Sequence, residues 1–156
     1  MFKHLLLPTD GSGSALSAAP RALALAQKFG SQVTAVFVID PYPYLEAGGM
    51  VTFSLEDYFV AARLEADLAL AAIKSVFDAA GFPLQTVVQE NHVPYEGILE
   101  VAKTVQADTI VMASHGRSGF VKLLMGSVTQ KVLSASEVPV LVVKDAAEEE
   151  SSKQAA

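Results

Sequence analysis

Short apolar segments alternate with amphipathic segments along almost the whole chain, and this alternation limits the fold more than any other feature. The apolar segments are typical of buried strands and cover Phe2–Leu7, Gln32–Ile39, Leu84–Glu90, Thr109–Ala113 and Val138–Val143. Helix-like segments separate them, over Ala15–Phe29, Ser54–Ala80, Pro94–Val105 and Ser127–Ala135. Strands that alternate with helices form right-handed βαβ units, so we expect an α/β fold, a Rossmann-like open sandwich with a parallel sheet and helices on both faces.

Local signals mark several helix ends. Ser12 or Ser14 is placed to cap the first helix, and Pro20 inside that segment should kink the helix or delay its start. Ser54 followed three residues later by Asp57 resembles a capping box at the start of the long second helix. These signals agree with the element assignment drawn from the apolar periodicity.

Two segments depart from the compact pattern. Asp40–Phe53 is long, aromatic and glycine-bearing, and we weigh a binding loop equally against a plain surface excursion. Asp145–Ala156 is polar and acidic, and we expect a disordered tail there. The remainder is one domain by length, with no internal repeat.

Composition excludes several classes of function. The net charge of −6 and the lack of a basic stripe argue against nucleic acid and against a membrane surface. No segment approaches the ~20 apolar residues that a transmembrane helix needs, and the N-terminus lacks the features of a signal peptide. The chain has no cysteine, and its three histidines lack metal-ligand spacing, so we expect no zinc site and a cytoplasmic location.

Ligands of open α/β sheets bind outside the carboxyl ends of the strands, where the strand order reverses. Three loops at such ends carry unusual chemistry: Pro8–Ser14, the segment that follows Ile39, and Ser114–Gly126. The first and third loops would face each other across one crevice if the first and fourth strands are neighbours.

The third loop leads into a helix through Gly126-Ser127. The first N–H groups of a helix lack internal partners and carry the positive end of its dipole, which suits an anion. Gly116 lets the backbone approach a ligand, and Arg117 and Lys122 add positive charge in an acidic chain. This arrangement fits a polyphosphate, and the alternative is an ordinary connection in which Ser127 caps the helix.

The motifs of several enzyme classes are absent or incomplete. The P-loop motif is absent, the dinucleotide fingerprint is incomplete at Gly11–Leu16, and no serine lies in a nucleophile elbow, which disfavours a hydrolase. Asp10 could bond a ribose hydroxyl or a metal, or simply order its own turn. His115 either lines the crevice or orders its loop, and no residue is placed as a general base, so hydrolysis should be slow or absent.

Four stretches together resemble the universal stress protein family: "LLLPTDGS" (5–12), "VFVID" (36–40), "MASHGRSGFVKLLMGSV" (112–128) and "VPVLVVK" (138–144). ATP-binding members of that family carry G-x2-G-x9-G-[ST]. This chain has Ala113, then Gly116, nine residues, and Gly126-Ser127, so the spacing matches and Ala113 replaces the first glycine. An alanine is tolerated there if its backbone φ is negative and weakens binding if φ must be positive.

The resemblance implies a five-stranded parallel sheet of order 3-2-1-4-5 in one universal stress protein domain, residues 1–144. It implies ATP, or another adenine nucleotide, with Mg2+, and dimerisation through the last strand, Val138–Val143. Adenine would lie near Val38, Pro8 and Thr9, ribose near Asp10, and phosphates at Gly116, Gly126, Ser127 and Val128. The full candidate set is Pro8, Thr9, Asp10, Val38, Met112, Ala113, Gly116, Arg117, Gly126, Ser127 and Val128, although Met112 also reads as a core residue.

Three functions follow from these observations. The leading one is a nucleotide-binding regulatory or stress-response protein. The second is a slow ATPase or nucleotidyl-transfer enzyme of the same fold, for which His115 and Asp10 are the only candidate bases. The third is a ligand-free dimeric adaptor in which the glycines are structural.

Overall fold

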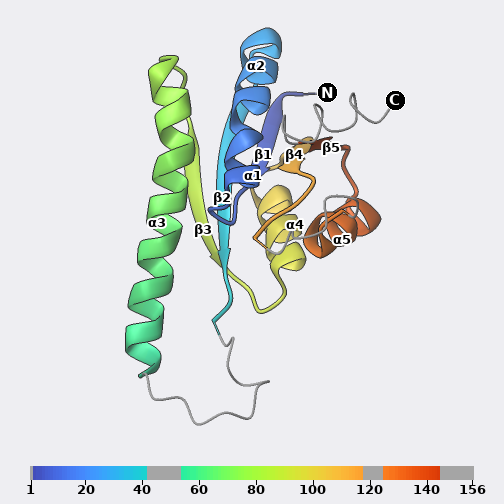
Figure 1. Ribbon diagram of the computed structural model, residues 1–156. Coiled ribbons are helices and arrows are strands. Elements are labelled where there is room, and N and C mark those ends of the chain that lie inside the picture. The colour runs from blue at the N-terminus through green and yellow to red at the C-terminus, as the bar shows by residue number, and fades with distance from the viewer. Residues whose placement is uncertain (1, 42–53, 118–124, 145–156) are drawn as a thin grey trace, which may run out of the picture.

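The computed structural model describes residues 2–41, 54–117 and 125–144. Five strands form one parallel sheet: β1 (His4–Pro8), β2 (Gln32–Ile39), β3 (Gln85–Glu90), β4 (Thr109–Ala113) and β5 (Val140–Val143). The helices are α1 (Gly13–Ser17), α2 (Ala19–Phe29), α3 (Leu55–Ala79), α4 (Pro94–Thr104) and α5 (Ser127–Ala135). The strand order is β3-β2-β1-β4-β5, which confirms the expected fold class and topology (Figure 1).

The centre of the sheet is β1, which is hydrogen-bonded to β2 on one side and to β4 on the other. Leu6 lies beside Thr34 of β2 and beside Ile110 of β4. The chain therefore leaves β1 in one direction through β2 and β3 and returns to its other side through β4 and β5. The switch point of the strand order is between β1 and β4, as the sequence argument required.

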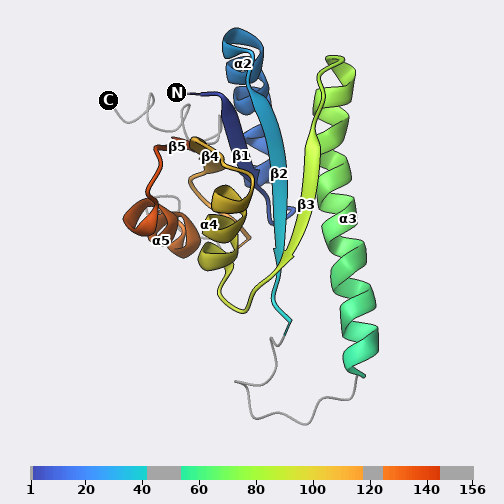
Figure 2. The same ribbon diagram turned by 180° about the vertical axis from the view of Figure 1, so that it is seen from behind.

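Helices cover both faces of the sheet (Figures 1 and 2), and each face has a core of its own. Leu5 and Leu7 of β1 pack in the core with α2 and α3, where Ile73 and Phe77 of α3 are fully buried. Leu6, between them in sequence, points to the opposite face and packs with α4 and α5. This alternation follows from the two-residue period of a strand, and it explains why every residue from Leu5 to Leu7 is apolar.

The helix ends follow the sequence signals with two changes. The helix expected over Ala15–Phe29 is two helices, α1 and α2, because the chain breaks at Ala18 so that Pro20 lies in the first turn of α2. Ser12 caps α1 and Ser54 caps α3, the latter accepting the N–H of Asp57. At α5 the N-cap is Gly126, so Ser127 is the first helical residue and not the cap.

Asp108 joins the starts of β1 and β4 at the edge of the sheet opposite to the strands' carboxyl ends. Its carboxylate accepts hydrogen bonds from the backbone N–H groups of Lys3 (2.9 Å) and His4 (3.5 Å) and from the Thr109 hydroxyl (3.3 Å). Partial burial acts to raise the pKa of Asp108, but these hydrogen bonds and the positive charge of the N-terminus together outweigh it and hold the pKa below its ordinary value.

Parts of the sequence analysis concern residues outside the described ranges. These are most of the Asp40–Phe53 loop, Lys122, and the acidic segment Asp145–Ala156. Among the described helices, none is long and apolar enough to cross a bilayer.

Candidate functional site

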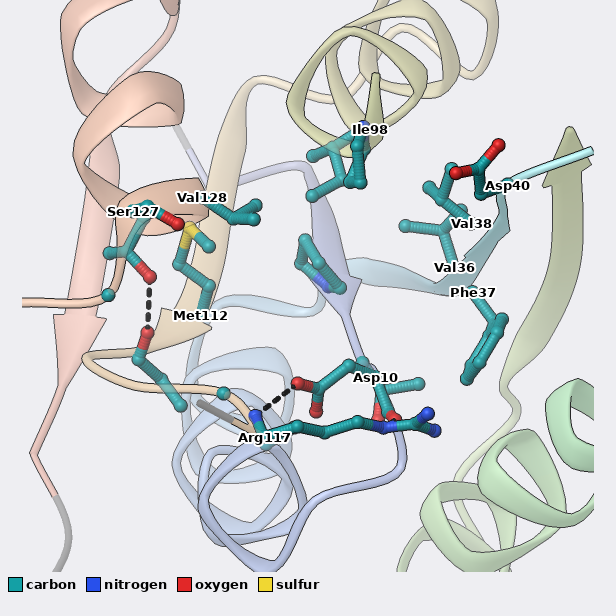
Figure 3. Close-up of a pocket in the computed structure, with 18 of the residues that line it drawn as sticks. Asp10, Val36, Phe37, Val38, Asp40, Ile98, Met112, Arg117, Ser127 and Val128 are labelled. Atoms are coloured by element: carbon teal, nitrogen blue, oxygen red, sulfur yellow. Dashed lines mark hydrogen bonds between the residues drawn. The ribbon is translucent and has the colours of Figure 1, made fainter. Parts of the chain in front are cut away.

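A cavity of about 650 Å³ opens at the carboxyl ends of β1, β2 and β4, next to the switch point (Figure 3). Its volume falls within the range of small-molecule and cofactor sites. Every residue of the candidate set lines it: Pro8, Thr9, Asp10, Val38, Met112, Ala113, Gly116, Arg117, Gly126, Ser127 and Val128. The structure thus brings residues from three distant parts of the sequence to one cavity.

The cavity has two chemically different ends. Ser127 and Val128, from the first turn of α5, lie at what we call the α5 end. Val36 and Val38 of β2 and Ile98 of α4 form the opposite, apolar side, which we call the β2 end (Figure 3). Asp10 and Arg117 lie along the edge between the two ends.

Uncapped backbone donors lie at the α5 end. The first N–H bonded within the helix is that of Gln130, which donates to the carbonyl of Gly126, so the N–H groups of residues 127–129 precede the intrahelical ladder. Gly126 has no side chain with which to accept them. Of the five helices described, α1 and α3 have serine caps and α2 and α4 have a proline in the first turn, whereas α5 has neither. The start of α5 is therefore suited to bind an anion.

The start of α5 is fixed to the end of β4 by two hydrogen bonds. The N–H of Gly126 donates to the carbonyl of Ser114 (2.9 Å), and the hydroxyl of Thr129 donates to the carbonyl of Ala113 (3.1 Å). A Cβ on Gly126 would lie 3.4 Å from the Ser114 carbonyl oxygen, in contact with the 114–116 backbone. A methyl group at Gly126 would therefore make ordinary van der Waals contacts, whereas a larger side chain there would press on the loop.

Ala113 is the last residue of β4 and pairs with Val143 of β5. Positive φ angles at non-glycine residues occur, within the described ranges, only at Phe2 and Gln106. The methyl group of Ala113 is buried in the core on the α1–α3 side of the sheet. The replacement of the first motif glycine by alanine therefore introduces no backbone strain here.

Asp10 organises the loop after β1. Its Oδ1 accepts hydrogen bonds from the N–H (3.0 Å) and the hydroxyl (2.6 Å) of Ser12, and its Oδ2 accepts the N–H of Arg117 (2.8 Å). A Cβ on Gly116 would overlap Oδ2 of Asp10, so only glycine lets the two loops come this close. Asp10 thus orders its own turn, which was one of the two roles considered for it from the sequence. It also fixes the position of the opposite loop through the N–H of Arg117.

Arg117 does not extend toward the α5 end. Its Nε donates to the carbonyl of Asp10 (2.6 Å), its Nη2 forms an ion pair with Glu65 of α3, and its guanidinium lies 5.9 Å from the centre of the Phe37 ring. Figure 3 shows the guanidinium turned away from Ser127. The positive charge that we expected beside the phosphates is placed at the edge of the cavity instead, bound to an acidic partner.

The β2 end is shaped by a close helix–strand contact outside the cavity. A Cβ on Gly97 of α4 would lie 2.9 Å from Cγ1 of Val38, so this glycine lets Val38 sit back against the helix. Beyond Val38, the carbonyl of Asp40 accepts the hydroxyl of Tyr58 (2.7 Å), and its carboxylate lies 2.9 Å from Nδ1 of His92. These contacts fix the end of β2 to α3 and to the β3–α4 connection.

Several cavity residues were not in the candidate set. They are Ala15, Val36, Phe37, Ile39, Asp40, Tyr58, Ala62, Glu65, Pro94, Ile98, His115, Met125 and Thr129. The rule that ligands lie at carboxyl ends of strands does point to Asp40, because it follows β2 directly. Glu65 and Tyr58 carry no such signal, since they are on a helix whose position over the sheet the sequence does not specify.

No cluster of three or more His, Cys, Asp or Glu that could hold a metal occurs among the described residues. Asp10 is one of the carboxylates that line the cavity, and the hydrogen bonds given above involve both of its oxygens. Mg2+ is commonly held by one or two carboxylates together with ligand phosphates. The Asp10 carboxylate therefore fits a magnesium ion that would arrive bound to a phosphate ligand.

A doubly wound sheet with a cavity at its switch point is the arrangement in which open α/β proteins bind small ligands. The model of the universal stress protein family matches residues 1–144. The chain is 33% identical over 144 residues to universal stress protein MJ0531 of Methanocaldococcus jannaschii, covering 92% of this chain and 83% of that protein. It is 34% identical over 148 residues to a universal stress protein of Thermus aquaticus, with 92% and 100% covered. The chain belongs to the universal stress protein family.

Solved structures agree with this membership. Protein MJ0577, which is also from M. jannaschii, superposes with a TM-score of 0.78 at 30% identity, covering 93% of this chain and 97% of that one. A universal stress protein in complex with cAMP gives a TM-score of 0.62 at 23% identity (92% and 97% covered). The Archaeoglobus fulgidus protein in complex with dAMP gives 0.61 at 20% (92% and 98% covered). The last two comparisons show a common fold, and their ligands are properties of those proteins.

Proposed function

We propose that this protein binds an adenine nucleotide, ATP with Mg2+, in the cavity at the switch point and acts as a regulatory module. The observation that carries the proposal is the start of α5, whose N–H groups have no capping side chain and no proline and open into the cavity. An anion at that place satisfies donors that would otherwise be left to water.

The phosphates belong at the α5 end. The hydrogen bond from the Gly126 N–H to the Ser114 carbonyl holds the helix start against the 114–116 backbone, and Gly116 adds no side chain to that backbone. The N–H groups of Ser127 and Val128 and the Ser127 hydroxyl are the donors we assign to phosphate oxygens. Arg117, which is paired with Glu65, serves to hold the two loops together in our proposal and is not assigned to the phosphates.

The base and the ribose belong toward the β2 end. Val36, Val38 and Ile98 offer an apolar surface to a planar base, and the β1 loop with Pro8 and Thr9 lies beside it. Asp10 lies between the two ends, where a ribose would be (Figure 3). That two proteins of this fold were solved with cAMP and dAMP supports an adenine nucleotide as the class of ligand.

Regulation would act through the surface around the cavity. A ligand that is bound only when the loops are ordered shifts the protein toward that state by its differential affinity. We further propose a homodimer through β5, which has β4 on one side and carries an apolar residue, Leu141, that is 41% exposed. An apolar edge strand is a natural site for pairing with a second copy.

The proposal is tested by looking for bound nucleotide and for stabilisation. The purified protein is denatured, and the supernatant is chromatographed for nucleotide. Thermal unfolding is then measured with and without Mg-ATP, where a concentration of 100 times Kd adds about 2.7 kcal/mol to the free energy of unfolding. No nucleotide and no shift at millimolar Mg-ATP would favour the ligand-free adaptor, and release of ADP within minutes would favour the ATPase.

A further inference from the structure

The outward face of α3 carries an apolar stripe. Val60, Leu64 and Leu68 are 66%, 59% and 64% exposed, although large apolar side chains in a helix of this length are usually directed to the core. They are four residues apart, so they form one continuous row along the helix. The exposed alanines Ala61 and Ala71 border the row, and α3 lies at the outer edge of the molecule in both views (Figures 1 and 2).

The space beside the stripe is hollowed. A shallow groove lies beside α3, lined by the apolar residues Ile39, Phe59, Val60 and Leu64 and by the charged residues Arg63, Asp67 and Glu90. The groove gives an apolar side chain from outside a place to enter. It is separate from the nucleotide cavity: Ile39, at the end of β2, is the only residue that lines both.

Charged residues follow one side of the stripe in an order that suits a second copy of the same helix. Glu56, Arg63, Asp67 and Lys74 lie on the groove side of α3 by helical geometry. Arg63 and Asp67 are each two positions from residue 65, and Glu56 and Lys74 are each nine positions from it, with opposite charges in each pair. Arg63 and Asp67 make no ion pair within the described part of the chain, whereas Lys74 pairs with Asp78.

We propose that α3 is a second self-association surface, at which two copies pair antiparallel about residue 65. In a twofold arrangement the same flank of each helix meets its equivalent, so Arg63 faces Asp67 of the other copy and Glu56 faces its Lys74, each pair occurring twice. The same alignment sets Leu64 near the other copy's Leu68 and Val60 near its Ala71, large against small. Charge and shape therefore specify one register.

The α3 surface and β5 lie at opposite ends of the sheet. In the strand order β3-β2-β1-β4-β5, α3 packs over β2, whereas β5 is the edge strand at the other end. A chain that pairs through both surfaces forms either a closed tetramer or an open row of copies. The inference stands apart from nucleotide binding, because no residue of the stripe lines the nucleotide cavity.

The test is the mass of the full-length protein in solution by analytical ultracentrifugation, with and without Mg-ATP. Leu64→Glu should lower the mass of the largest species at least twofold, to half for a closed tetramer and by more for an open row. Leu55→Glu is the matched control: Leu55 is 64% exposed on the same helix, but it lies nine residues away, about two and a half turns, on the opposite face. Leu55→Glu should leave the mass unchanged.

Charge reversal tests the register. Arg63→Glu places a like charge opposite Asp67 and should lower the mass as Leu64→Glu does, and Arg63→Glu combined with Asp67→Arg should restore it. Equal masses for the wild type and Leu64→Glu over a wide concentration range would overturn the proposal and leave the stripe to a different partner. Failure of the double reversal to restore the mass would overturn the register.

Discussion

The carboxylate of Asp10 accepts the backbone N–H of Arg117 at 2.8 Å, and the Arg117 side chain in turn donates to the Asp10 carbonyl at 2.6 Å, although 107 positions separate them. This reciprocal contact closes the crevice between β1 and β4 from one side. It sets the distance between the two loops before any ligand binds. A site whose loops are already in place loses less conformational entropy on binding.

Removal of the Asp10 carboxylate should loosen this crevice. Asp10→Ala leaves the N–H groups of Ser12 and Arg117 without their acceptor, so we expect the free energy of unfolding to fall by about 1–3 kcal/mol and Mg-ATP affinity to fall with it. Chemical denaturation and calorimetric titration measure the two effects. Asp78→Ala, at an exposed ion pair, is the control and should change neither by more than about 0.5 kcal/mol.

Gly116 should not tolerate a methyl group. A Cβ there overlaps Oδ2 of Asp10, so Gly116→Ala must displace the carboxylate and break its bond to Arg117. We expect weaker Mg-ATP binding and a lower melting temperature. Gly13→Ala is the control, because a Cβ at Gly13 meets nothing within 4 Å, and it should be neutral or slightly stabilising. Equal tolerance of both substitutions would contradict the close approach of the two loops.

Gly97 should determine the depth of the β2 end. Gly97→Ala puts a Cβ at 2.9 Å from Cγ1 of Val38 and at 3.0 Å from Cβ of Asn91, so either the side chain that forms the β2 end shifts or α4 moves away from β2. We expect weaker binding of adenine nucleotides in this variant. A double-mutant cycle with Val38→Ala checks the cause: the two changes should be non-additive by about 0.5–3 kcal/mol in binding free energy, and strict additivity would exclude the contact.

Asp108 should make stability depend on acidic pH. Its pKa is lowered in the folded protein, so its contribution is present above its ordinary pKa of 3.8 and is lost as the pH falls through the lower, folded value. Asp108→Asn removes the titrating group. The difference in free energy of unfolding between wild type and variant should therefore shrink as the pH falls below about 4, and a difference that stays constant with pH would argue against this assignment.

Elements of this fold could be predicted because their signals are local. Period-two and helical patterns, the Ser54 cap and the Gly126-Ser127 helix start are each contained in a few adjacent residues. The site residues could be placed in one cavity because the carboxyl ends of parallel strands share an edge, and because the resemblance gave the strand order.

Contacts between distant residues could not be predicted in this way. The sequence indicates that Arg117 is a cation near a phosphate loop, but the acceptor that it meets, Glu65, is on a helix whose rotation and position depend on packing over the whole sheet. The contact of Gly97 with Val38 has the same origin, since it depends on how closely α4 approaches β2. Local signals determine which helices and strands form. The distances between residues on different elements depend on how those elements pack in the tertiary structure.

The central claim, that backbone N–H groups at the start of α5 bind phosphate, is tested most directly by removing one of them. Gly126 has φ −58° and ψ 145°, a conformation that suits the residue before a proline, and α2 and α4 already carry proline in their first turns. Ser127→Pro therefore deletes one N–H and keeps the helix, and Ser127→Ala controls for loss of the hydroxyl. By calorimetric titration we predict that Ser127→Pro binds Mg-ATP about 10- to 100-fold more weakly than Ser127→Ala, the effect of one hydrogen bond to a charged group, while adenosine binds both equally. Equal Mg-ATP affinities in the two folded variants would contradict the account.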